Sequence, residues 1–86
     1  MGQLADLPNI GKVLEQQLEE VGIHTEEDLK RIGAEQIWLR IQRIDESACI
    51  HRLLALEGAI QGVKKNFLPE IRKAELKEFY QKQKGK

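Results

Sequence analysis

The chain has 86 residues, of which 41% are hydrophobic and 33% are charged. This length suits one small domain, and the composition is that of a soluble globular chain, which argues against disorder, a collagen-like repeat and a membrane span. We therefore expect a single domain over residues 1–80, followed by a frayed basic tail over residues 81–86.

The net charge is zero, but the charges are unevenly distributed. Residues 1–28 hold seven acidic residues and one basic residue, whereas residues 29–86 hold thirteen basic and seven acidic residues. Nucleic-acid affinity depends on a local excess of Lys and Arg, which only the second part supplies. A solvated basic helix is the commoner explanation of such a run. The candidate basic surface consists of Lys64, Lys65, Arg72, Lys73 and Lys77.

The N-terminal segment and the cysteine content indicate a cytoplasmic protein. Residues 1–10 have no basic start and lead into no apolar stretch, so a signal peptide is not expected. Cys49 is the only cysteine in the sequence, so no intramolecular disulfide can form, which fits a reducing compartment. No apolar run approaches the roughly 20 residues that a spanning helix needs, so no membrane contact is expected.

Apolar spacing and Gly and Pro breaks predict five helices and no strand, and hence an all-α fold. The first helix is expected from about Asn9 to Val21. Gly22 should end this helix in a left-handed Schellman stop, with Ile23 folding back onto Leu18. Its buried stripe should comprise Ile10, Val13, Leu14, Leu18 and Val21.

The second and third helices are expected to follow closely. Thr25 should cap the short second helix, because its hydroxyl can accept a hydrogen bond from the amide of Asp28. Gly33 should end this helix in a Schellman stop equivalent to the one at Gly22. The third helix is predicted from about Ala34 to Ile44. Its buried residues should be Ile37, Trp38, Ile41 and Ile44.

The fourth helix, expected from about Ser47 to Lys64, should be central because it is apolar on two sides. One side is bulky, and the other would let a neighbour approach closely through its small residues, which are Ala55, Gly58, Ala59 and Gly62. The fifth helix is predicted to begin near Leu68–Pro69 and to end at about Gln81. Its apolar contacts should come from Ile71, Leu76, Phe79 and Tyr80.

Glu57 lies on the bulky apolar face of the fourth helix, three residues after Leu54. A carboxylate there should be at least partly buried, and a buried charge needs hydrogen-bond donors. The candidate donors are the amides of residues 9–11, Arg40 and the Trp38 indole. Two alternatives stay open, because Glu57 can either pin two elements together or remain available to a ligand or partner.

No constellation for catalysis is evident, and we predict that the protein is not an enzyme. Ser47 and Thr25 are the only Ser and Thr, and both are helix-cap candidates. Cys49 and His51 are two residues apart and would point to different sides of a helix, so a core Cys and a surface His are expected rather than a catalytic pair. The sequence has no zinc-ligand spacing, no phosphate-binding loop and no dinucleotide fingerprint, so neither a metal nor another cofactor is expected.

Residues 7–12, Leu-Pro-Asn-Ile-Gly-Lys, and residues 22–29, Gly-Ile-His-Thr-Glu-Glu-Asp-Leu, together resemble the helix-hairpin-helix group. In such hairpins a Gly-containing turn at a helix N-terminus presents amides to a phosphate, and a following Lys adds charge. Lys12 is the one base among seven acids, so a purely structural hairpin is the favoured alternative. The candidate phosphate or DNA contacts are Asn9, Ile10, Gly11 and Lys12.

A longer stretch, from Leu7 to about Leu76, resembles the C-terminal domain of the TfoX/Sxy family, regulators of competence and transformation in bacteria. The run Ala-Leu-Glu-Gly-Ala-Ile at residues 55–60 follows a matching front half. Asn9 is the residue expected in this family, whereas Lys65 stands where the family often has Trp. The long members also carry an N-terminal domain with no counterpart in these 86 residues. The other matching residues are Leu7, Ile10, Gly11, Leu18, Gly22, Ile23, Thr25, Asp28, Leu29, Gly33, Ala34, Gly62, Leu68 and Pro69.

The resemblance implies a compact five-helix SAM-like bundle, distantly similar to the C-terminal domain of the bacterial RNA polymerase α subunit. It also implies a regulatory module that contacts a protein partner in competence or transcription regulation. The alternative hypothesis is a nucleic-acid-binding domain that uses the hairpin or the basic C-terminal helix, with weak affinity. The partner's identity and a homodimer are left open. The candidate structural or partner-contact residues are Glu57, Gly58, Gly22 and Gly33.

Overall fold

The computed structural model describes residues 4–84, and in that range it contains five α-helices, two short 3-10 helices and no strand. This confirms the predicted all-α class with five helices. In chain order the elements are η1 (Leu4–Asp6), α1 (Lys12–Glu20), α2 (Glu26–Ile32), α3 (Ala34–Ile44), α4 (Ile50–Gln61), η2 (Lys65–Phe67) and α5 (Glu70–Lys84).

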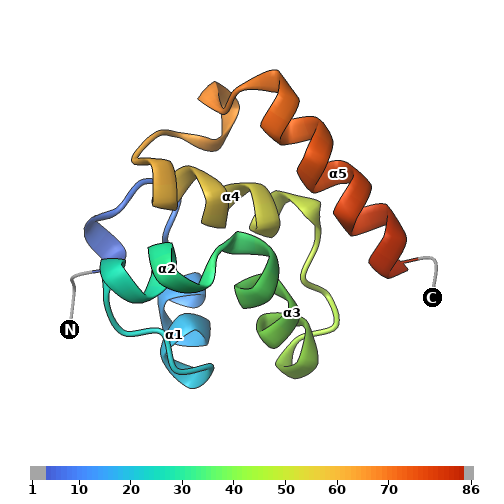
Figure 1. Ribbon diagram of the computed structural model, residues 1–86. Coiled ribbons are helices and arrows are strands. Elements are labelled where there is room, and N and C mark those ends of the chain that lie inside the picture. Colours follow the sequence, from blue (N-terminus) through green and yellow to red (C-terminus); the bar gives the residue numbers. More distant parts are fainter. Residues whose placement is uncertain (1–3, 85–86) are drawn as a thin grey trace.

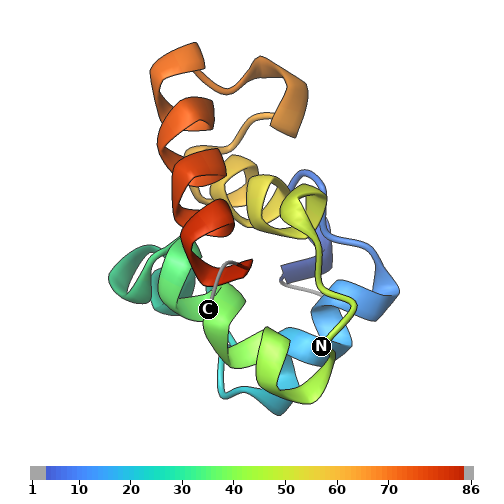
Figure 2. The same cartoon turned by 90° about the vertical axis from the view of Figure 1, so that its right-hand side faces the viewer.

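Helix α4 lies in the middle of the bundle, as its two apolar sides predict (Figure 1). α2 and α3 pack against it, and α1 packs against α3. α5 covers the other side of α4, and the turned view shows it descending toward α3 (Figure 2). No helix among residues 4–84 combines the length and the apolar character needed to cross a membrane.

Trp38 of α3 is the largest fully buried side chain in the core. Its indole N–H donates a hydrogen bond of 3.2 Å to the carbonyl of Cys49. Phe79 and Tyr80 of α5 meet its ring edge to face, with centroid separations of 6.1 and 5.6 Å, a geometry that aromatic pairs favour. Trp38 thereby joins α3 to both α5 and the loop before α4.

The two predicted glycine stops behave differently. Gly22 (φ 89°) ends α1 in the expected Schellman motif, because the amide of Ile23 donates to the carbonyl of Leu18 and the amide of Gly22 donates to that of Glu19. Gly33 also has a positive φ of 92°, but its ψ of 155° is extended, so it is not the equivalent stop that was predicted. The chain turns at Gly33 and begins α3 directly, with Gly33 as the N-cap.

Several predicted helix ends are wrong by a few residues, and local side chains explain why. Asn9 is left-handed (φ 71°), so α1 begins only at Lys12. Asp45 accepts hydrogen bonds from the amide and hydroxyl of Ser47, which holds a turn there and delays the start of α4 to Ile50. Gly62 (φ 75°) then caps α4 instead of extending its stripe of small residues.

α5 begins at Glu70 and continues to Lys84, beyond the predicted end at Gln81. The tail expected to fray from residue 81 is therefore helical as far as Lys84, and residues 85–86 lie outside the described range. The domain boundary at residue 80 stays a prediction.

Three apolar residues assigned to the core are exposed instead. Val13, Ile44 and Ile71 retain 64%, 50% and 74% of their accessible surface. Each lies within the first or last turn of its helix. Ile44 has the helical spacing of the buried Ile37 and Ile41, so its exposure follows from its position as the last residue of α3 and not from the face of the helix.

Candidate functional site

Asn9 connects the N-terminal turn to the segment after α4. Its Nδ2 donates to the carbonyl of Val63 at 3.0 Å, and its Oδ1 accepts from the amide of Lys65 at 3.1 Å. Asn tolerates the left-handed backbone found here better than most residues do. The side-chain amide of this candidate phosphate contact is thus engaged at both ends within the fold.

Gly58 allows this connection to form. A Cβ atom at Gly58 would lie 2.7 Å from the carbonyl oxygen of Val63, and closer still to the side-chain nitrogen of Asn9. The small-residue stripe of α4 does admit a close neighbour, as predicted. That neighbour is the N-terminal turn together with the chain that follows α4, and not a further helix.

A groove of about 420 Å³ opens beside this contact, between the starts of α1 and α4. Neither N-cap, Gly11 or Cys49, makes a side-chain capping hydrogen bond. The predicted hairpin contact and the predicted basic surface, which were alternatives, both contribute to this groove. Asn9, Gly11 and Lys12 of the hairpin line it together with Lys65 of the basic surface. Ile10 is buried and does not line it. The lining residues are Asn9, Gly11, Lys12, Val13, Leu14, Cys49, His51, Arg52, Ala55 and Lys65.

Arg52 is a groove residue that the sequence analysis missed. Its Nη1 donates to Oδ2 of Asp45 at 2.8 Å and to Oε1 of Gln17 at 3.1 Å, while Gln17 donates to the same Asp45 oxygen. Gln17 is itself buried, although it is polar. The signal available in the sequence was that Arg52 and Glu57 are the two charged residues of a helix rich in apolar residues.

The five residues of the predicted basic surface have different roles. Lys64 and Lys77 are exposed, and Lys65 is half-buried at the groove. Lys73 donates to the carbonyl of Asn66 at 3.1 Å and lies 3.5 Å from Glu70. Arg72 is surrounded by carboxylates, so the five cations do not form one open basic face.

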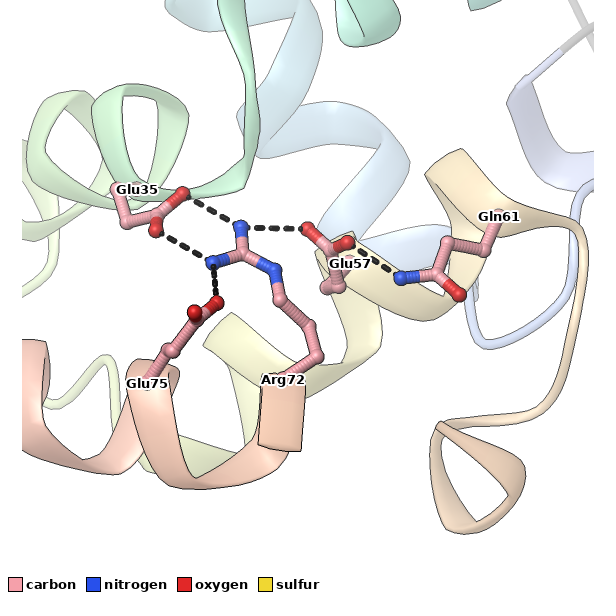
Figure 3. Close-up of polar contacts among 5 residues, drawn as sticks. All are labelled: Glu35, Glu57, Gln61, Arg72 and Glu75. Atoms are coloured by element: carbon pink, nitrogen blue, oxygen red, sulfur yellow. Dashed lines mark hydrogen bonds and ion pairs between the residues drawn. The ribbon is translucent and has the colours of Figure 1, made fainter. Parts of the chain in front are cut away.

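Arg72 of α5 binds carboxylates from α3 and α4 as well as one from its own helix (Figure 3). Both of its terminal nitrogens donate to Glu35 at 2.9 Å, Nη2 also donates to Glu57 at 3.0 Å, and Nη1 donates to Glu75 at 3.2 Å. Gln61 donates to the second oxygen of Glu57 at 2.6 Å. Three helices therefore meet at one guanidinium.

Glu57 is 7% exposed, which agrees with the burial predicted for its carboxylate. The donors proposed for it were wrong, because Arg40 donates to the carbonyl of Val21 and the Trp38 indole donates to that of Cys49. The amides of residues 9–11 do not bind it either. Arg72 lies fifteen residues away on another helix, so helical spacing around Glu57 could not identify it.

Acidification is expected to destabilise the fold. The hydrogen bond from Arg72 lowers the pKa of Glu35 below 4.5, and the Ser47 hydroxyl, Arg52 and Gln17 hold the pKa of Asp45 well below 3.8. A carboxyl whose pKa is lowered by folding binds fewer protons in the folded state, so its stabilisation is complete above the unfolded pKa and is lost as the pH falls through the folded one.

Urea unfolding between about pH 7 and pH 3 tests this, and the midpoint should fall steadily below about pH 5. The Asp45→Asn variant should show a flatter decline over the same range. An equal decline in both proteins would contradict the assignment to Asp45.

His51 is exposed as expected, whereas Cys49 is only half-buried, at the N-cap of α4, and is not the core residue that was predicted. Among residues 4–84 no three His, Cys, Asp or Glu side chains lie close enough together to hold a metal ion.

Phe67 adds a further apolar residue to the surface, with 73% of its accessible surface exposed.

Comparison with known proteins gives consistent matches. A family model described as the TfoX C-terminal domain matches residues 1–80. Protein Sxy of Escherichia coli (strain K12) is 40% identical over 77 residues, which are 90% of this chain and 37% of Sxy. The chain thus spans little more than a third of that relative.

Two crystal structures from Listeria monocytogenes have the same fold. An uncharacterized protein in a triclinic form is 50% identical with a TM-score of 0.93, and the match covers 95% of this chain and 93% of that one. A protein of unknown function in a tetragonal form is 50% identical with a TM-score of 0.90, and the match covers 93% of this chain and 98% of that one.

Proposed function

Because the chain belongs to the TfoX C-terminal domain family, we propose that it is a cytoplasmic, non-enzymatic module that regulates competence or transcription through contact with a protein partner. The regulatory role is supported by the family and by the identity to Sxy. Sxy is much longer than this chain, so its full activity is not carried over with the match.

One observation favours a protein partner over nucleic acid, namely that two of the five cations of the candidate basic surface are engaged within the fold. Arg72 binds Glu35, Glu57 and Glu75, and Lys73 is held by its own segment. A duplex requires several Lys and Arg residues that can neutralise phosphates along one face.

Binding to random duplex DNA is therefore expected to be weak. At about 150 mM salt the Kd should be no tighter than the ~10⁻⁴ to 10⁻⁶ M of non-specific contacts. Fluorescence anisotropy with a labelled duplex measures this directly. Sub-micromolar binding that is lost in Lys12→Glu would support the hairpin hypothesis. A loss on charge reversal at Lys64 and Lys77 would place the DNA contact on the candidate basic surface.

The proposed function is tested by affinity capture of the tagged chain from lysate of its own host, with and without nuclease. A regulator that acts by protein contact should retain defined protein partners after nuclease treatment. Recovery of nucleic acid alone would contradict the proposal. Transcript levels of DNA-uptake genes in a deletion strain, with and without complementation, test the regulatory role separately.

A further inference from the structure

We propose that the groove between the starts of α1 and α4 is the docking site for a short acidic protein segment that carries an apolar side chain. This inference rests on the proposed function and specifies the chemistry of the partner. It is drawn from the charge, the apolar lining and the preorganisation of the groove.

The charged lining of the groove has one sign. Lys12, Arg52 and Lys65 contribute cations, of which Arg52 is already paired with Asp45, and no carboxylate lines the groove. In the part of the chain that the structure describes, neither Lys12 nor Lys65 makes an ion pair. Opposite charge on the partner would give these two lysines the counter-ions that the fold does not supply.

The remaining lining is apolar, which distinguishes the favoured occupant from a phosphate chain. Leu14 and Ala55 line the groove although they are nearly buried, and Val13 lines it while 64% of its own surface is exposed. A sugar-phosphate backbone gains little from such a surface, whereas an apolar side chain is stabilised by burial against it.

The surroundings limit the occupant to a short segment. Glu15 follows Lys12 by three residues in α1, and Glu19 and Glu20 are exposed at the end of the same helix. An extended polyanion lying along α1 would be repelled by these carboxylates. A few acidic residues next to an apolar anchor can bind at Lys12 and Lys65 without reaching them.

The groove walls are held in place before anything binds. The Asn9 side chain accepts a hydrogen bond from the backbone amide of Lys65, and the Arg52 side chain donates hydrogen bonds to Asp45 and Gln17. A segment that docks here therefore orders little of the chain, which reduces the entropic cost of binding.

The test uses ¹⁵N-labelled chain and short synthetic peptides of matched length. One peptide has a Leu-Phe pair between Asp and Glu residues, a second replaces the pair with Ser, and a third replaces the acids with Asn and Gln. The first peptide should bind and shift the amide resonances of residues 11–14, 51–52 and 65. The second and third peptides should each bind about tenfold more weakly, because each lacks one of the two recognised features.

Variants locate the site on the chain. Lys12→Glu and Val13→Asp change exposed side chains, so the fold should survive, as unfolding curves would check. Each should weaken binding of the first peptide about tenfold. Lys77→Glu is the matched control, since it reverses an exposed lysine outside the groove and should leave the affinity within about twofold.

Several results would overturn the proposal. These are no binding of the first peptide, shifts centred on Phe67 and Ile71, equal losses in Lys12→Glu and Lys77→Glu, or tighter groove binding by a single-stranded oligonucleotide than by the peptide. Sedimentation that shows a dimer abolished by Lys12→Glu would instead assign the groove to a second copy of the chain.

The two proposals can fail separately. If the peptide does not bind, yet wild type and Lys12→Glu capture the same nuclease-resistant proteins, the groove assignment is wrong and the protein-contact function stands. If lysate capture yields nucleic acid alone, the proposed function is wrong whatever the peptide does.

Discussion

Gly58→Ala is expected to destabilise the fold by about 2–3 kcal/mol, although Ala is the better helix former by about 1 kcal/mol. The added Cβ would meet the Val63 carbonyl oxygen at 2.7 Å and lie even closer to Asn9 Nδ2. Relief requires the segment after α4 to move, which weakens the two hydrogen bonds of Asn9, each worth about 1 kcal/mol. Chemical denaturation of both proteins measures the difference.

Two further variants identify the cause of the effect. Gly11→Ala places a Cβ where nothing lies within 4 Å and φ is −95°, so only a loss of N-cap preference of about 1 kcal/mol or less is expected. In an Asn9→Ala background, Gly58→Ala should cost less than in wild type, because one of the clashing groups is gone. A Gly58→Ala protein as stable as wild type would show that the close approach is not needed.

The helices could be predicted from the sequence because local signals and apolar periodicity agree over most of the chain. The Thr25 hydroxyl accepts a hydrogen bond from the amide of Asp28, as its position suggested, and Gly22 ends α1 as expected. Gly33 shows the limit of this approach. A glycine after an apolar residue is compatible with more than one backbone path, and the immediate start of α3 selects the extended one.

The burial of Glu57 could be predicted, but its partner could not. Burial follows from the position of Glu57 within α4, which is a local property. The partner depends on how α5 crosses α4, and that crossing places Arg72 beside Glu57 and Glu35 (Figure 3). The run of bases in residues 64–86 indicated a basic surface, yet Arg72 within that run serves as an internal link.

The groove was inaccessible to sequence reasoning for a related reason. Its two walls are the starts of α1 and α4, about forty residues apart along the chain. Asn9 was expected from the family resemblance, but the structure gives the physical reason that its side chain suits this position. It spans from the N-terminal turn to Val63 and Lys65, which no periodicity relates to residue 9.

Arg72→Met is expected to cost about 2–3 kcal/mol of stability. The change keeps much of the side-chain length but leaves Glu57, which is 7% exposed, without its cationic partner. Breaking a fully buried ion pair typically costs about 3–5 kcal/mol, and the smaller figure here reflects the 24% exposure of the Arg72 side chain. Lys73→Met is the matched control, because its contacts are exposed and should be worth less than about 1 kcal/mol.

Glu57→Gln tests whether the buried carboxylate pins the helices together or serves a partner. If it is structural, the variant should lose about 1–3 kcal/mol of stability, since a neutral amide forms weaker hydrogen bonds than a carboxylate. The NH2 group of the new amide would also face a donor, which is either the Gln61 side chain or Arg72. Glu57→Gln and Arg72→Met should then be strongly non-additive, because either change disrupts the same contact. Binding of the acidic peptide at the groove should stay unchanged in Glu57→Gln wherever the protein is folded. A Glu57→Gln protein with full stability that no longer binds its partner would show instead that Glu57 belongs to the binding surface.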